Sequence, residues 1–127
     1  MSGINRPWRG ITIFTVALVL LPLLVTDSTV AQIRYLRGQN VAPAFEGWQE
    51  NDDGTFTFFF GYMNRNYEEV VDLPIGQDNF FAPGPVDRGQ PTHFITRRQR
   101  FVFGVTVPED WGIEDRLTWT LTANGRT

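Results

Sequence analysis

Residues 55–64 read TFTFFFGYMN, and this stretch decides the fold. Its large aromatic residues at positions 56, 58, 60 and 62 recur at every second place, which puts them on one face of an extended strand. The preceding residues 44–50 (AFEGWQE) are also consistent with a strand, and the polar segment 51–54 (NDDG) lies between the two. Glycine adopts the positive φ that tight hairpin turns require. These residues predict a β-hairpin over residues 44–64.

Working outward, four more segments carry strand signals of different strength. Leucine and tryptophan alternate with threonine in residues 117–122 (LTWTLT), and residues 94–107 form a long region in which Phe101, Phe103, Val105 and Val107 share one face. Residues 69–75 (EVVDLPI) predict a third strand, and residues 33–36 give a weaker signal. Residues 77–92 (QDNFFAPGPVDRGQPT) contain three prolines, so we expect a connection without a regular strand.

Short strands separated by turns predict an all-β fold. We expect an antiparallel immunoglobulin-like or fibronectin-type-III-like sandwich of about six or seven strands. Residues 123–127 (ANGRT) look like a hairpin turn whose second strand has only begun. Either the chain is truncated there, or its last sheet edge is open to pairing with another strand.

The first 31 residues have the order of a secretory signal peptide. Residues 1–10 carry two arginines and no acid, residues 11–25 (ITIFTVALVLLPLLV) are largely apolar, and residues 29–31 (TVA) resemble a cleavage site. We place cleavage after Ala31, which leaves residues 32–127 as a periplasmic, cell-surface or secreted domain. The alternative is an uncleaved membrane anchor, although the apolar run is shorter than the about 20 residues that a spanning helix needs.

Composition excludes several chemistries. The chain has no cysteine and no lysine, and both serines lie within residues 1–31. A serine or cysteine nucleophile, a Schiff-base lysine and a disulfide are therefore absent from residues 32–127. The formal net charge of −3 does not suit a nucleic-acid-binding protein, which needs a basic face. We expect no cofactor, and membrane contact only through the N-terminal segment if it stays uncleaved.

The remaining polar candidates are weak. His93 is the single histidine, and alone it cannot build a usual zinc site. The acidic segments 51–54 and 109–115 are candidate calcium ligands, but they lack the spacing of an EF-hand loop, and ordinary polar turns are the simpler interpretation. We expect the arginine run 97–100 to pair with acids such as Glu68, Glu69 or Asp72.

The aromatic residues divide into a candidate core and a candidate binding set. Phe80, Phe81 and Trp111 lie in connections, where exposed rings could stack on a sugar or seat a partner, with Arg88 nearby. The simpler interpretation is that these rings cover a small sandwich. The candidate core consists of Trp48, Phe56, Phe58, Phe60, Tyr62, Phe101, Phe103 and Trp119.

Three motifs within residues 60–103 form a longer pattern. They are Gly-Tyr-x-Asn at 61–64, Pro-x-Gly-x-x-Asn at 74–79, and Pro-Gly-Pro-x-Asp-Arg-Gly-Gln-Pro at 83–91. With them the chain resembles a recurrent, mostly uncharacterised module of exported bacterial proteins. The resemblance implies an immunoglobulin-like sandwich outside the cytoplasm and no established activity.

The same motifs have a physical interpretation. Asn64 and Asn79 are suited to bonding backbone groups in turns. Asp87 and Gln90 are suited to tying the long loop to itself, helped by an ion pair between Arg88 and a carboxylate.

The leading functional hypothesis is a non-catalytic exported module with a structural or protein-interaction role in the bacterial envelope or exterior. The alternative is a carbohydrate-binding module that uses the loop aromatics. A carboxylate-dependent hydrolase, which needs two acids, is a remote third hypothesis, because no acid of the chain is marked as special by its neighbours.

Overall fold

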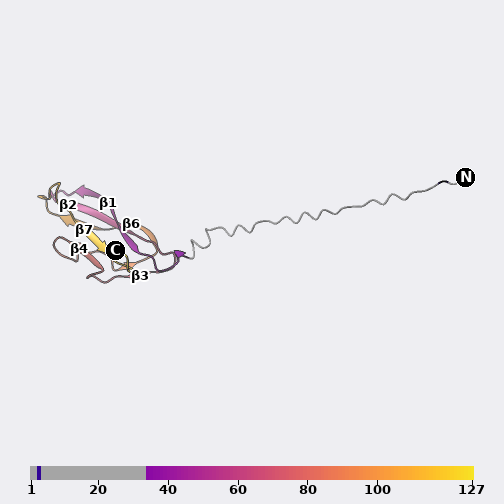
Figure 1. Ribbon diagram of the computed structural model, residues 1–127. Coiled ribbons are helices and arrows are strands. Elements are labelled where there is room, and N and C mark those ends of the chain that lie inside the picture. The colour runs from indigo at the N-terminus through magenta and orange to yellow at the C-terminus, as the bar shows by residue number, and fades with distance from the viewer. Residues whose placement is uncertain (1–2, 4–33) are drawn as a thin grey trace.

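The computed structural model describes Gly3 and residues 34–127, and the described residues form an all-β, antiparallel fold (Figure 1). The predicted all-β, antiparallel class is therefore confirmed. The predicted signal peptide and its cleavage site lie outside the described residues. The strands are β1 (Val41–Glu50), β2 (Phe56–Asn64), β3 (Val71–Asp72), β4 (Asn79–Ala82), β5 (His93–Phe94), β6 (Arg97–Val107) and β7 (Thr118–Leu121).

Three sheets are built from these strands. β2 lies between β1 and β6 in the largest sheet, β3 pairs with β5, and β4 pairs with β7. The predicted β1–β2 hairpin is confirmed: the Asn51 amide donates to the Thr55 carbonyl at 2.7 Å, and Gly54 has a φ of 84°. Across the described part of the chain, no helix is long and apolar enough to cross a membrane.

The core lies between the β1–β2–β6 sheet and the β4–β7 pair. Phe81 from β4 stacks on Trp119 from β7 with ring centroids 5.8 Å apart, and Phe60 from β2 meets Phe81 edge-on at 5.4 Å. Tyr62 is also buried, and its hydroxyl accepts a hydrogen bond from the Ile95 amide at 3.1 Å. Burial raises the pKa of the Tyr62 phenol above its ordinary value. In a chain without cysteine, the packing of buried aromatic rings thus holds these layers together.

Two predicted strand boundaries are wrong. The segment 69–75 contributes only the two residues of β3: the Leu73 amide still donates to the Thr92 carbonyl at 2.8 Å, but the Leu73 carbonyl accepts the Asn79 side chain, and Pro74, which has no amide hydrogen, follows. The connection 77–92 contains β4, which pairs with β7. β4 ends at Ala82, before the first proline of the loop, so the prolines limit its length and do not prevent it.

The long region 94–107 is also interrupted. Phe94 belongs to β5 and pairs with β3, whereas β6 begins at Arg97 and pairs with β2. A register shift in the β2–β6 pairing gives β6 extra residues, and Phe101 lies there with a φ of 47°. Its ring is 61% exposed and lies 6.1 Å from Phe59, so its predicted place on the core face is wrong. Extra residues in one strand of a pair shift the alternation of side chains, so that a residue expected on one face of the sheet lies on the other.

Gly61 of β2 leaves room for a side chain of β1 to contact a side chain of β6 across β2. A Cβ atom at this position would overlap the Gln99 carbonyl oxygen and the Glu46 carboxylate. In the space that glycine leaves, Glu46 forms an ion pair with Arg98, and the Glu46 side chain is only 7% exposed. The partner of the arginine run is therefore Glu46, and Arg97 stacks on the ring of Tyr67 at 3.9 Å.

The C-terminal turn over residues 123–126 contacts the segment that precedes β1. Asn124 and Gly125 have positive φ, and Ala123 and Arg126 exchange backbone hydrogen bonds at 2.9 and 3.0 Å, which confirms the predicted turn. The Asn124 side chain donates to the Gln39 carbonyl at 2.8 Å. Residues 35–38 form turns and bends and residue 34 is not extended, so the weak strand expected over residues 33–36 is not present in its described part.

Candidate functional site

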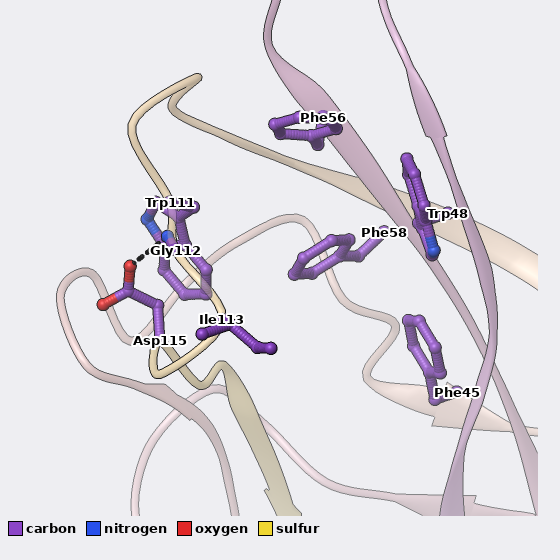
Figure 2. A pocket seen from close by; sticks show the side chains of 8 residues that line it. All are labelled: Phe45, Trp48, Phe56, Phe58, Trp111, Gly112, Ile113 and Asp115. Atoms are coloured by element: carbon purple, nitrogen blue, oxygen red, sulfur yellow. Dashed lines mark hydrogen bonds between the residues drawn. The ribbon is translucent and has the colours of Figure 1, made fainter.

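An apolar groove of about 430 Å³ opens between the β1–β2 hairpin and the loop that connects β6 to β7 (Figure 2). One wall consists of aromatic residues of the hairpin, and the other consists of residues of the loop. In Figure 2, Trp111 and Ile113 stand opposite Phe45 and Trp48, with Phe58 between them. The lining residues are Phe45, Trp48, Phe56, Phe58, Trp111, Gly112, Ile113 and Asp115.

The register of the sheet explains why these aromatic side chains are exposed. Trp48 pairs with Phe58, so both rings share the face that carries the buried Phe60. The rings of Phe81 and Trp119 cover that face at Phe60. Toward the β1–β2 turn, the loop over residues 108–117 is what approaches the face, and Trp48 is left 61% exposed. The prediction that Trp48 belongs to the core is therefore wrong.

Contacts between rings hold the hairpin wall in place. The Trp48 and Phe56 centroids are 5.6 Å apart with an angle of 74° between the rings, and Phe45 meets Phe58 edge-on at 5.9 Å. Phe58 also touches the opposite wall, since its centroid is 5.9 Å from that of Trp111. Edge-to-face contacts of this kind are favourable arrangements of aromatic rings.

The loop wall is held by hydrogen bonds within the loop. The Gly112 amide donates to Asp115 Oδ2 at 2.6 Å, and the Asp115 amide donates to the Gly112 carbonyl at 3.1 Å. Arg116 Nη1 donates to the carbonyls of Ile113 and Asp115 at 2.8 and 2.9 Å. Ile113 lines the groove at its open edge, with 88% of its surface exposed. The groove is thus largely formed before any occupant arrives.

Acidic side chains surround this end of the sheet. Among residues 50–54 and 108–116 there are seven carboxylates and one arginine, which is half of the fourteen acids of the whole chain. Glu109 lies against the β1–β2 turn beside Gly54, so the two segments share one rim. Hydrogen bonds from the Thr55 hydroxyl and, second, the Thr55 amide lower the pKa of Asp53 below its ordinary value. The rim therefore carries an excess of acids over basic residues.

The sequence-predicted contact residues do not form one surface. Trp111 lines the groove and Phe80 is half-buried, but Phe81 is completely buried and stacks on Trp119. Phe81 is therefore a core residue, because β4 turns its ring toward the β1–β2–β6 sheet. Arg88 lies in the proline-rich loop, where its guanidinium donates to the carbonyls of Pro83 and Pro85. These bonds, and not the expected pair with a carboxylate, are what tie Arg88 to its loop.

The four residues assigned to loop structure all bond backbone groups. Asn64 Nδ2 donates to the carbonyls of Glu69 and Phe94 at 2.8 and 3.0 Å. Asp87 Oδ1 accepts the Gly89 amide, and Gln90 accepts the Arg88 amide and donates to the Val86 carbonyl. Asn79 donates to the carbonyls of Leu73 and Pro91 at 2.9 and 2.8 Å. Asn64 and Asn79 are fully buried, so these bonds replace lost contacts with water.

Other polar candidates lie away from the groove or are occupied. His93 Nδ1 lies 2.6 Å from Asp72 Oδ1 across the β3–β5 pair, and both side chains are largely exposed. Asp53 and Asp115, from the two candidate calcium segments, bond amides and a hydroxyl within their own turns. Within the described residues, no cluster of three or more His, Cys, Asp or Glu side chains is placed to hold a metal ion.

Sequence reasoning did not single out Phe45 or Ile113, which line the groove, and it considered Asp115 only as a calcium candidate. Phe45 follows an irregular β1–β2 register, with a shift between Phe45 and Gly47, so simple alternation misplaces it. Ile113 is an aliphatic side chain among the mostly polar residues 109–116, and this contrast was a usable signal. Compared with known proteins, the chain matches no family model, no curated protein and no solved structure.

Proposed function

We propose that this chain is an exported, non-catalytic protein-interaction module of a bacterial envelope or exterior, built on an immunoglobulin-like sandwich. The signal-peptide order of residues 1–31 and the motifs of residues 61–91 support export and this fold. Packing of the β4–β7 pair over the β1–β2–β6 sheet is compatible with two sandwich layers. The composition of residues 32–127, which lack serine, cysteine and lysine, supports a non-catalytic role.

The observation that carries the proposal is the aromatic groove. Tryptophan and other large side chains dominate the binding energy of protein interfaces when they are exposed in a pre-formed cluster. Trp48 and Phe45 are both apolar and line the same groove, and yet they are 61% and 60% exposed. Water is a poor environment for such a surface, so covering it with a partner gains free energy.

Photo-crosslinking in living cells tests the proposed interaction. A photoreactive phenylalanine analogue at position 113 is expected to give a discrete protein adduct, because Ile113 stands at the open edge of the groove. Trp48→Ala is expected to reduce the adduct by more than about tenfold, in line with the loss of an interface hot spot. The measurement is the adduct yield on a denaturing gel.

Phe101→Ala is the matched control, because Phe101 is as exposed as Trp48 but lies beside Phe59, on the other face of the sheet. The same analogue at Val86, which is exposed in the proline-rich loop, controls for random encounters. Equal adducts from positions 113 and 86, or insensitivity to Trp48→Ala, would contradict the proposed binding surface.

A carbohydrate-binding module is the second candidate. It is favoured by the two indole rings of Trp48 and Trp111, which line the same groove and have faces suited to stacking on sugar rings. In this case a glycan array is expected to show binding that Trp48→Ala abolishes, and the crosslinker at position 113 is expected to give no protein adduct. The pair of assays therefore separates the two candidates.

The export part of the proposal has its own test. Residues 1–40 fused to a reporter that is active only outside the cytoplasm are expected to give a signal, and replacing the apolar residues 18–20 by aspartate is expected to abolish it. A reporter that stays in the cytoplasm without this replacement would contradict export.

A further inference from the structure

The charges of the domain are unevenly divided along the β1–β2–β6 sheet. At one end, Glu50 pairs with Phe56 and Phe56 pairs with Val107, and the groove and its acidic rim lie there. At the other end, Val41 pairs with Asn64 and Asn64 pairs with Arg97. Arg34, Arg37, Arg65 and Arg97 lie near that end, together with two acids, Glu68 and Glu69. At the groove end carboxylates outnumber arginines seven to one over residues 50–54 and 108–116, whereas the opposite end carries charges of both signs.

Aromatic rings and carboxylates together attract one class of ligand. The face of an aromatic ring carries negative charge density, so an ammonium or guanidinium group is attracted to it, and tryptophan is the strongest ring in this respect. Trp48 and Trp111 supply two such rings in the groove, and Asp115 supplies a carboxylate on its wall. An anionic ligand meets repulsion from the same groups.

The domain already contains a contact of this kind. Arg97 lies with its guanidinium carbon 3.9 Å from the centre of the Tyr67 ring, so an arginine side chain packs on an aromatic ring within this fold. The groove has more rings and more carboxylates than that site, and the described residues include a single arginine in its rim loop. That arginine, Arg116, has Nη1 bonded to loop carbonyls.

We propose that the groove binds an arginine or lysine side chain of a protein partner, flanked by apolar residues that cover Phe45 and Ile113. This inference rests on the proposed protein-interaction function and names the chemistry of the partner. The groove holds a cavity of about 430 Å³ that is open to solvent, which suits side chains presented by an extended segment. Asp115 already accepts the Gly112 amide through Oδ2, and a carboxylate has capacity for a further donor.

Three short peptides test the inference. They are capped peptides with the sequences Gly-Leu-Arg-Leu-Gly, Gly-Leu-Gln-Leu-Gly and Gly-Leu-Glu-Leu-Gly, titrated calorimetrically into the chain purified from cells that export it. The arginine peptide is expected to bind about tenfold more tightly than the glutamine peptide, and the glutamate peptide is expected to bind most weakly. High salt is expected to narrow the difference, because ions screen exposed charges.

Asp115→Asn separates the charge from the shape of the loop, since asparagine keeps an oxygen acceptor for the Gly112 amide. This substitution is expected to lower the affinity for the arginine peptide about threefold to tenfold and to leave the affinity for the glutamine peptide unchanged. Asp78→Asn is the matched control, because Asp78 is an exposed acid in the turn before β4 and not in the rim segments. Asp78→Asn is expected to leave the affinity for both peptides unchanged.

Several outcomes would overturn the inference without touching the proposed function. If the glutamine and arginine peptides bind equally and Trp48→Ala abolishes both, the groove is an interaction site without a preference for cations. If no peptide binds while position 113 crosslinks to a protein, the partner has another chemistry. A crosslink to a second copy of this chain, or glycan binding lost in Trp48→Ala, would replace the proposed occupant.

Discussion

Phe81→Ala is expected to lower the free energy of unfolding by about 3–5 kcal/mol. Phe81 is completely buried, and its ring touches three others: it stacks on Trp119 and meets Phe60 and Phe103 edge-on. Truncation removes the apolar contacts of a whole ring and leaves a cavity between the β4–β7 pair and the larger sheet. Since domains of this size are stabilised by about 5–15 kcal/mol, the variant loses a large part of its margin.

Urea denaturation followed by far-ultraviolet circular dichroism measures this loss. Phe101→Ala is the control, because Phe101 is 61% exposed and its removal is expected to cost less than about 1.5 kcal/mol. A loss below that figure for Phe81→Ala would contradict the placement of Phe81 in the core.

Asn79→Ala is expected to lower the free energy of unfolding by at least about 3 kcal/mol, because three buried polar groups lose their partner at about 1–3 kcal/mol each. The Asn79 amide group donates to the carbonyls of Leu73 and Pro91, and its Oδ1 accepts the Trp119 indole N–H at 2.9 Å. The side chain is fully buried, so water does not replace these bonds. One residue thus connects the β3 exit, the proline-rich loop and β7.

Two further variants divide this effect into its parts. Trp119→Phe removes the indole bond with some packing, and Asn79→Asp keeps an acceptor for the indole while losing both donors. Asn79→Asp is expected to be at least as destabilising as Asn79→Ala, because a buried carboxylate would face two carbonyl oxygens. Urea midpoints for the set give the comparison. A loss below about 1 kcal/mol for Asn79→Ala would contradict the bonding described here.

Local sequence patterns predicted the elements whose partners are close in the chain. The aromatic alternation of residues 56–62 and the polar segment 51–54 specify the β1–β2 hairpin, and the Asn124-Gly125 pair specifies the last turn. In each case the period of the strand or the φ of the turn is a property of a few neighbouring residues. β7 follows the same rule, since Trp119 and Leu121 are buried and alternate with more exposed threonines.

Elements that depend on distant partners were predicted less well. β4 exists because β7, about forty residues later, offers a pairing edge, and its residues lie directly before a proline-rich loop. The same pairing decides that Phe81 faces the core. Phe101 shows the converse case, because a register shift against β2 turns a residue from the expected inner face to the outside. Neither effect leaves a local periodic signal.

The candidate site follows the same division. Its tryptophans and phenylalanines were visible as apolar residues of strands, and its acids were visible as polar turns, but no spacing in the sequence relates residues 45–58 to residues 111–115. The groove arises where the β4–β7 pair stops covering the sheet and the loop after β6 begins to approach it. The part of the larger sheet that stays uncovered depends on how far the β4–β7 pair extends over it. The residue pattern of one strand carries no information about the length of the layer that packs on it.

The sequence by itself determined the all-β class, the central hairpin, the final turn and the lack of serine, cysteine and lysine chemistry in residues 32–127, because these depend on side-chain period, backbone φ and composition. Only the tertiary structure decided that Phe81 is buried and Trp48 exposed, that Glu46 pairs with Arg98, and that an acidic rim surrounds an aromatic groove. The physical reason is that burial and charge environment are set by which layer covers which face, and that covering is done by residues far away in the chain.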